Sequence, residues 1–368
     1  MYFLLLAAVF FLAFSNGAND NFKGVATLRQ SRYYSFGRAV AWAAVWTALG
    51  SVAGIWFAAK LLPIFSGAGL IHSGIDAESF LVAVGGGAAL TVFVAVKIGM
   101  PISTTHALAG ALTGTALLAG GWSNFHPGVL GMTVFLPLLL TPLAAMGLTW
   151  STFPLLRRIF PVTRSCICMT PAQMSPALVG AETLALPAQP TPSDFLPSIT
   201  IDTAAACAIH SPGAKWRTDV NEVLHWFSGG LISFSRGMND TPKIAALLLL
   251  PALGISTGTA FAGVAVAMLL GGTLAVRRVA KTVSEDVTDI QPVEGTGANL
   301  VTAALVTLAS PLGLAVSTTH TAVGSIFGVG LSQPERTNGR KVREILLAWL
   351  LTLPMAGLLG SALYFLLQ

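Results

Sequence analysis

The chain has 368 residues, of which 54% are hydrophobic and only 10% are charged, and its mean hydropathy is +0.74. A soluble domain carries about 25% charged residues, so this composition excludes a large soluble enzyme with an apolar core and predicts an integral membrane protein. Basic loops facing anionic lipid account for the net charge of +5, which therefore does not indicate nucleic-acid binding.

Ten apolar segments follow one another along the chain, five in each half. In the first half they cover residues 1–28, 39–59, 80–97, 100–119 and 129–153. In the second half they cover residues 223–250, 259–276, 300–315, 317–331 and 345–367. Several reach the roughly 20 residues that a helix needs to cross a bilayer. Met1 leads directly into the first run without a basic region or cleavage site, so we expect a first span rather than a removed signal peptide.

Polar and charged residues interrupt the first segment of each half in the same pattern. The stretch Phe14–Lys23 returns 220 positions later as Phe234–Lys243, with Phe, Ser, Gly, Asn, Asp and Lys in register. Ionisable groups within an apolar span are costly and usually mark a substrate or ion path. We therefore expect the helices to be broken near residues 16–20 and 236–240.

A second motif confirms that the chain is duplicated. Gly99–His106 contains Ser-Thr-Thr-His and is matched by Gly313–His320, and glycines follow each His after four and eight residues. Because both motifs keep their order, the chain consists of two copies of one unit, residues 1–153 and 223–368. The Pro-rich stretch 154–222 has the composition of a linker and separates them.

The basic residues indicate how the chain is oriented, since cytoplasmic loops collect Lys and Arg. With the N-terminus outside, fifteen of the twenty fall in inner loops: Arg29, Arg32, Arg38, Arg157, Arg158, Arg164, Lys215, Arg217, Arg277, Arg278, Lys281, Arg336, Arg340, Lys341 and Arg343. We therefore expect a multi-pass protein of the inner (cytoplasmic) membrane, with both termini outside and residues 154–222 in the cytoplasm.

The odd number of segments in each half predicts that the second copy enters the membrane from the opposite side. The expected fold is therefore all-α, with two inverted-topology repeats of about five segments each and discontinuous helices. Inverted repeats of this kind are typical of secondary transporters, with a binding site near the bilayer midplane. Segments 80–97 and 100–119 are either two full crossings or one re-entrant hairpin; the Gly-Ala-rich composition after Pro101 favours the hairpin.

The Ser-Thr-Thr motifs predict an anion site. Pro101 breaks the incoming segment, and Ser103 is a good N-cap for a helix over residues 104–118. Free backbone N–H groups and the hydroxyls of Ser103, Thr104 and Thr105 then point at one spot and bind an oxyanion readily. The second repeat supplies Ser317, Thr318 and Thr319 in the same way. The alternative is that these hydroxyls only bond to neighbouring helices.

The carboxylates Asp20 and Asp240 need a separate explanation, since they repel a bare anion. With Asn19 and Asn239, they either hold a coupling cation or accept a hydrogen bond from a protonated oxyanion. The alternative is a structural ion pair between each Asp and a nearby Lys.

Two further matched pairs are candidate site residues. Lys23 and Lys243 follow each Asp by three residues, which places them one helical turn away as built-in countercharges. His106 and His320 are either packed core histidines or proton relays.

The cysteines carry no predicted chemistry. Cys166, Cys168 and Cys207 all lie in the linker, and an odd number gives no disulfide framework. The Cys-x-Cys pair supplies only two ligands, so we expect no metal site. Neither a nucleophile–base pair at recognisable spacing nor a phosphate-cradling Gly-Lys-Ser loop occurs in the sequence, so we expect neither an enzyme nor a cofactor.

Taken together, these motifs resemble those of the PiT inorganic phosphate transporter family. The resemblance rests on Gly-Ala-Asn-Asp at 17–20, Gly-Met-Asn-Asp at 237–240, Pro-Ile-Ser-Thr-Thr-His at 101–106, Val-Ser-Thr-Thr-His at 316–320 and Ala-Trp-Leu-Leu-Thr-Leu-Pro at 348–354. It implies phosphate symport coupled to H⁺ or Na⁺, two hairpins and a large cytoplasmic loop. It also implies substrate or ion roles for the Asn-Asp and Ser-Thr-Thr residues.

The chain departs from the family pattern at two matched places. The family signature usually has an Asn three residues after the Asp, where this chain has Lys23 and Lys243. An ammonium there either replaces a coupling cation or adds positive charge to the anion site.

Two alternatives therefore accompany phosphate symport. One is a permease for sulfate or another tetrahedral oxyanion, from the same superfamily. The other, from a different class, is a non-coupled anion channel or membrane receptor. The expected partners are phosphate or sulfate, H⁺ or Na⁺ and the lipid bilayer, with a homodimer as a further option and no nucleic acid.

Overall fold

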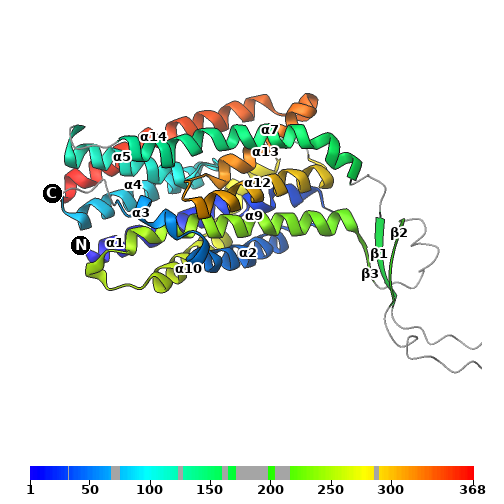
Figure 1. The fold of residues 1–368 in the computed structure, drawn as a ribbon, viewed down its shortest axis with the longest axis horizontal. Coiled ribbons are helices and arrows are strands. Elements are labelled where there is room, and N and C mark those ends of the chain that lie inside the picture. Colours follow the sequence, from blue (N-terminus) through cyan, green and yellow to red (C-terminus); the bar gives the residue numbers. More distant parts are fainter. Residues whose placement is uncertain are drawn as a thin grey trace, which may run out of the picture.

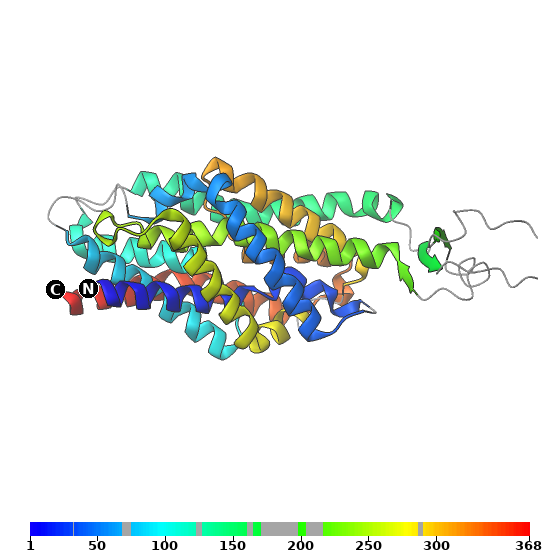
Figure 2. The ribbon, with the colours of Figure 1, turned by 90° about the horizontal axis from the view of Figure 1, so that it is seen from below.

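The computed structural model describes residues 1–31, 33–67, 75–122, 127–159, 165–170, 198–203, 216–285 and 290–368. Most of the described part is helical, and the long helices lie side by side along one axis (Figures 1 and 2). Within it, seven helices are long and apolar enough to cross a bilayer. The predicted all-α, multi-pass membrane protein is confirmed.

Each of the ten predicted apolar segments is confirmed as helical. The first half contains α1 (Tyr2–Asp20), a 3-10 helix (Lys23–Gln30), α2 (Phe36–Phe57), a 3-10 turn (Ala59–Leu61), α3 (Leu62–Phe65), α4 (Ala77–Ile98), α5 (Thr104–Gly120), α6 (Pro127–Leu130), a π-helical turn (Gly131–Phe135) and α7 (Leu136–Ile159). The second half contains α9 (Val220–Ala245), 3-10 turns (Ala246–Leu248 and Pro251–Leu253), α10 (Thr257–Leu274), α11 (Arg277–Glu285), α12 (Pro292–Leu312), α13 (Thr318–Ser332), a 3-10 turn (Pro334–Arg336) and α14 (Gly339–Leu367).

The predicted helix breaks are placed wrongly. The break expected near residues 16–20 comes later, because α1 continues through Asp20 and the 3-10 helix begins at Lys23. The break expected near residues 236–240 does not occur, because α9 continues to Ala245. Polar side chains in these stretches bond to other elements rather than to their own backbone. The helical hydrogen bonds are therefore kept, as an apolar surrounding requires.

The linker contains three short strands that the sequence analysis did not predict. They are β1 (Ser165–Thr170), β2 (Ser198–Thr203) and β3 (Trp216–Asp219), in an antiparallel sheet of order β2-β1-β3. Figure 1 shows this sheet beyond the end of the helix bundle that is opposite to both chain termini. Cys166 and Cys168 lie on β1. Cys207, Arg32, Arg164, Lys215 and most of the linker lie outside the described residues.

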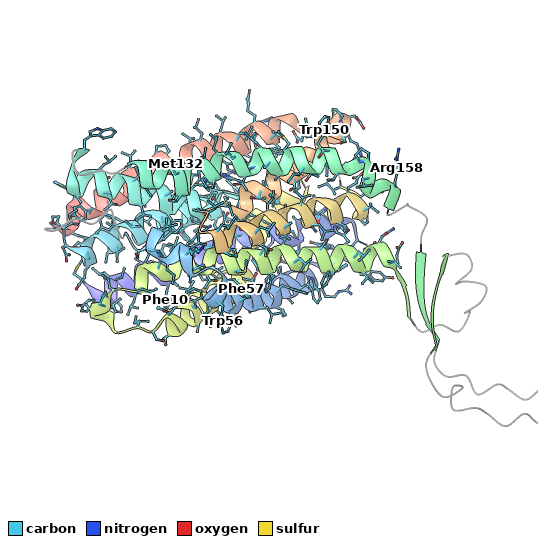
Figure 3. The ribbon with its side chains drawn as sticks, in the orientation of Figure 1. Phe10, Trp56, Phe57, Met132, Trp150 and Arg158 are labelled. Carbon is cyan, nitrogen blue, oxygen red and sulfur yellow. The ribbon has the colours of Figure 1, made fainter. Side chains whose placement is uncertain are left out.

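The outside of the bundle is apolar, and its charged membrane-spanning side chains lie inside, among a largely hydrophobic core. Phe10, Trp56, Phe57, Met132 and Trp150 are exposed along the outer surface (Figure 3). All the charged residues of α1 and α9, by contrast, are buried. Because hydrocarbon cannot solvate charges, polar groups within a span must find partners inside the bundle.

Two helical hairpins meet in the middle of the bundle. α4 packs on α5 and α12 packs on α13, and in Figure 1 the two pairs reach the middle from opposite ends. Gly99 and Gly313 end α4 and α12 with φ of 76° and 74°, a left-handed conformation that glycine adopts at little cost. The tips of the hairpins are the extended segments 100–103 and 314–317.

The helices of the two halves are paired across the duplication. α1 packs on α10 as α9 packs on α2, and α5 packs on α14 as α13 packs on α7. α1 begins at the end where the chain termini lie, whereas α9 begins at the end where the sheet lies (Figure 1). These two matching helices therefore run in opposite directions, as the predicted inverted duplication requires.

The glycines of the repeated motifs lie where these helix pairs cross. A Cβ added at Gly17 would lie 1.9 Å from the Met268 carbonyl oxygen of α10, and one at Gly237 would lie 2.1 Å from the Thr47 carbonyl oxygen of α2. Neither glycine has a positive φ. These motif glycines are therefore required for close helix approach, a common use of small residues in membranes.

This packing predicts that Gly17→Ala and Gly237→Ala each lower stability by about 1–3 kcal/mol, because an added methyl would overlap a backbone carbonyl. The thermal unfolding midpoint of the purified protein in detergent measures the effect. Gly147→Ala in α7 is the matched control, since no atom lies within 4 Å of its added Cβ. Equal midpoints for all three variants would contradict the packing role.

Candidate functional site

Five charged side chains are buried where α1, α9 and the two hairpin tips meet. They are Asp20, Lys23, Arg236, Asp240 and Lys243, each with 1–4% of its surface exposed. With all five ionised, three cations and two carboxylates leave a formal charge of +1. Burying charges costs several kcal/mol each unless they are paired and hydrogen-bonded, so their partners define the site.

Oxygen atoms surround the Lys23 ammonium. Its Nζ contacts Asp20 Oδ1 and donates to Asn19 Oδ1 at 2.6 Å, the Ile102 carbonyl oxygen at 2.7 Å and Thr319 Oγ1 at 2.8 Å. Carboxylate, amide, carbonyl and hydroxyl oxygens are also the ligands that hard metal cations prefer. Ile102 belongs to the first hairpin tip and Thr319 to the start of α13, so this one ammonium connects both hairpins.

Lys243 occupies the matching place in the second repeat, with a looser ion pair. Its Nζ donates to Thr105 Oγ1 at 2.9 Å and to the Val316 carbonyl oxygen at 2.6 Å. The distance from Nζ to Asp240 Oδ1 is 3.8 Å. Thr105 is in the first hairpin and Val316 in the second. Each lysine therefore joins the tip of its own hairpin to the first turn of the second helix of the opposite hairpin.

The side chain of Asn16 links the two carboxylates. Its Nδ2 donates to Asp20 Oδ2 at 2.9 Å, to Asp240 Oδ2 at 3.2 Å and to Thr104 Oγ1 at 2.9 Å. Thr104 Oγ1 in turn donates to Asp20 Oδ2 at 3.2 Å. The two carboxylates thus face a common amide, and the surrounding cations offset their mutual repulsion.

Arg236 provides the third positive charge. Its guanidinium donates to Asn16 Oδ1 at 3.0 Å, and to Asn21 Oδ1 and Thr47 Oγ1 at 3.1 Å each. Its Nε lies 4.0 Å from Asp240 Oδ2, and has no hydrogen-bond partner within the described part of the chain. A buried N–H without a partner is costly, and here it is a donor that a bound oxyanion can use.

Asn16 and Arg236 are the site residues that the sequence analysis did not select. They occupy matching positions in the two repeats, 220 residues apart, yet differ in charge. A charge difference at one position of an otherwise matched motif could have indicated that both residues belong to the site.

The predicted hairpin residues are brought together as expected, although the serines serve mainly as caps. Ser103 Oγ accepts from the His106 N–H at 3.1 Å, and Ser317 Oγ accepts from the His320 N–H at 3.2 Å. Both predicted N-caps are confirmed. The helices α5 and α13 therefore begin next to the buried charges, with their positive dipole ends directed at the site.

Two threonines join the hairpins to each other, and two asparagines attach the hairpins to α1 and α9. Thr105 Oγ1 donates to the Val316 carbonyl oxygen at 3.3 Å, and Thr319 Oγ1 donates to that of Ile102 at 3.1 Å. The matched amide contacts are Asn19 Nδ2 to the Met100 carbonyl oxygen at 3.0 Å, and Asn239 Nδ2 to the Val316 carbonyl oxygen at 3.2 Å and to Thr318 Oγ1 at 3.3 Å. The two threonine contacts mirror each other across the duplication, whereas the two amides reach different positions of their hairpin tips.

His106 and His320 lie one turn beyond the serines and pack against each other. Their ring centroids are 4.1 Å apart, and the His320 ring lies 3.7 Å from that of Trp349. Trp349 Nε1 donates to the Pro101 carbonyl oxygen at 3.2 Å, which holds the stack against the first hairpin tip. No hydrogen bond joins either ring to Asp20 or Asp240 in the described residues, so the geometry favours packed histidines over a direct relay.

A sequence model described as the phosphate transporter family matches residues 16–360 of the chain. The chain belongs to this family. The phosphate transporter family consists of transport proteins rather than enzymes, which agrees with the sequence analysis. The match includes all five buried charges and both hairpins.

Individual relatives and one solved structure agree with this assignment. The chain is similar to a "probable low-affinity inorganic phosphate transporter" of Mycobacterium tuberculosis, 26% identical over 99% of this chain and 77% of that protein. It is also similar to a Bacillus subtilis protein of the same name, 28% identical over 73% of this chain and 69% of that one. The solved structure titled "The sodium-dependent phosphate transporter" shares the fold, with a TM-score of 0.74, 23% identity and coverage of 99% and 98% of the two chains.

The unequal ion pairs predict unequal effects on stability. Asp20→Asn removes the direct partner of the Lys23 ammonium, and breaking a buried pair typically costs about 3–5 kcal/mol. Asp240→Asn should cost less, because Lys243 Nζ already lies 3.8 Å from Asp240 Oδ1, beyond hydrogen-bond distance. Thermal or denaturant unfolding of the purified variants gives the two values.

A double-mutant cycle separates this pairing from general disruption. The cycle of Asp20→Asn with Lys23→Gln should give a coupling energy of about 1 kcal/mol or more, and the matched cycle of Asp240→Asn with Lys243→Gln a smaller one. Equal coupling in both cycles would show that the two ion pairs are equivalent.

Proposed function

We propose that this protein takes up inorganic phosphate across the cytoplasmic membrane by secondary active transport, with the anion bound between the two hairpin tips. The observation that carries the proposal is the buried cluster of three cations and two carboxylates in a chain of the phosphate transporter family. The names of its relatives, low-affinity inorganic phosphate transporters, support the same substrate.

The charges suit a tetrahedral oxyanion that carries a proton. The excess positive charge, the Arg236 Nε–H and the N-termini of α5 and α13 all attract an anion. Asp20 and Asp240 accept hydrogen bonds, and a protonated phosphate can donate one whereas sulfate at neutral pH cannot. This difference favours phosphate over the alternative substrate, sulfate.

The lysines occupy the place of a coupling cation. Lys23 Nζ is held by four oxygen atoms of the kinds that would bind a metal ion, and Lys243 is placed likewise. A bound cation and the ammonium cannot fill the same place at once. We therefore infer that transport depends on H⁺ or the membrane potential, and only weakly on Na⁺.

The same contacts suggest how binding is linked to movement. Each lysine joins the two hairpins, and each hairpin belongs to a different half of the proposed inverted pair. Rocking of one half against the other, the usual motion of such folds, has to break these bonds. The basic residues of the loops at the sheet end of the bundle support a cytoplasmic position for that end and an outside position for both termini.

Substrate identity is tested by uptake into proteoliposomes with labelled phosphate and labelled sulfate, each under an imposed pH gradient. We expect concentrative uptake of phosphate that exceeds that of sulfate. Equilibration without accumulation would indicate a channel, and no uptake of either anion a receptor. Preferred uptake of sulfate would contradict the proposed substrate.

In the same assay we expect Asp20→Asn and Asp240→Asn each to abolish phosphate uptake, because both carboxylates face the anion through Asn16. Gel filtration and the unfolding midpoint check that each variant is folded. If either folded variant took up phosphate at the wild-type rate, its carboxylate would be excluded from the site.

The role of the lysines is tested with the double variant Lys23→Asn/Lys243→Asn, which restores the residue that the family signature usually has. We expect lower uptake at zero sodium and a rise in uptake as sodium is added, since oxygen ligands become free for a cation. The single variants should fall between the double variant and wild type. A double variant that stays insensitive to sodium would contradict the replacement of a cation by the ammonium groups.

A further inference from the structure

A basic pocket lies at the sheet end of the bundle. It is separate from the charge cluster, by which we mean the five buried charged side chains of the candidate site. It has a volume of about 370 Å³ and lies between the 3-10 helix after α1, the start of α2 and α11. Its lining includes three basic and three aromatic side chains: Arg29, Arg277, Lys281, Phe22, Tyr34 and Phe36. None of the described residues that line it is acidic.

Two cations of α11, Arg277 and Lys281, have no anionic partner among the residues that the structure describes. The Arg277 guanidinium lies over the Phe36 ring at 5.7 Å, and Phe36 stacks on Phe22 with a centroid distance of 5.4 Å. Within the described part of the chain, neither Arg277 nor Lys281 forms a hydrogen bond or ion pair. They are four residues apart on one helix, where like charges repel. An anion bound between them would remove this repulsion.

The other repeat provides an internal comparison. A smaller hollow of about 170 Å³ is lined by Ser66, Gly67, Leu81, Ala246, Leu249, Leu250 and Pro251. Leu249 stands 220 residues after Arg29 and is therefore its counterpart in the repeat. The duplicated fold thus leaves a hollow in both halves, whereas only one of them is positively charged. The charge is a property of this pocket and not a consequence of the architecture.

We propose that the basic pocket binds a phosphate group, either that of an anionic lipid headgroup or free inorganic phosphate. Arg side chains bind phosphate oxygens in pairs of hydrogen bonds, and basic pockets between helices on the cytoplasmic side bind anionic headgroups. Phe22 lines the pocket and directly precedes Lys23 in the chain. Occupancy therefore stabilises the junction of α1 and the 3-10 helix, independently of which anion the protein transports.

The test uses the full chain in nanodiscs of phosphatidylcholine alone or with added phosphatidylglycerol. The readouts are the unfolding midpoint and the binding of fluorescent phosphatidylglycerol. The variant is Arg277→Gln/Lys281→Gln, and the control is Arg38→Gln/Arg343→Gln, which removes two exposed charges that do not line the pocket. For a lipid ligand we expect phosphatidylglycerol to raise the midpoint of wild type and control, and to bind the variant about ten-fold or more weakly.

A second arm adds inorganic phosphate to the phosphatidylcholine nanodiscs. A phosphate-dependent rise in midpoint that is smaller in the variant than in the control would assign the pocket to the free anion. Phosphate that binds at the charge cluster raises the midpoints of variant and control equally. The difference between the two midpoint rises therefore reports on the basic pocket alone.

Equal responses of variant and control in both arms would overturn the proposal and leave only general surface attraction. The single variant Lys281→Glu is a check that does not depend on the folding of the double variant. Its side chain is exposed, and its reversed charge should abolish the response to either ligand. A retained response in that variant would also overturn the proposal.

Discussion

The need to satisfy buried charge within a bilayer determines the centre of this structure. The ammonium groups of Lys23 and Lys243 each bond to a carbonyl oxygen of one hairpin tip and to a threonine of the other hairpin. Because lipid offers these charges no solvent, α1, α9 and both tips must assemble together. The close helix crossings at Gly17 and Gly237 place the charged segments within reach of the hairpins.

The duplication supplies the scaffold, and departures from its symmetry supply the chemistry. Helix pairs, caps and hairpin tips match between the halves, as do the lysine contacts. Arg236, by contrast, stands where the first repeat has Asn16, and Arg29 stands where the second repeat has Leu249. The first difference gives the buried cluster an excess of positive charge. The second gives the hollow at Arg29 a basic side chain, where the hollow at Leu249 has an apolar one.

Much of this could be predicted because it depends on local patterns. Apolar length marks the helices, and Ser103 and Ser317 cap the next helix through a backbone group three residues away. The contacts of Asn16 with Thr104 and Asp240 span 88 and 224 residues, so no local pattern reveals them. The prediction of a helix break at 236–240 was wrong because these polar side chains bond to partners far away in the sequence, and the helix therefore continues. The short strands of the linker carry no strong pattern either.

The central claim is that the lysines take the place of a coupling cation at a phosphate site. The most direct measurement is calorimetric titration of the purified wild-type protein with phosphate, in sodium chloride and in choline chloride at the same pH and ionic strength. The account predicts dissociation constants that agree within about two-fold. Binding that is stronger by about ten-fold or more in sodium would show coupling between the two ions and contradict the account.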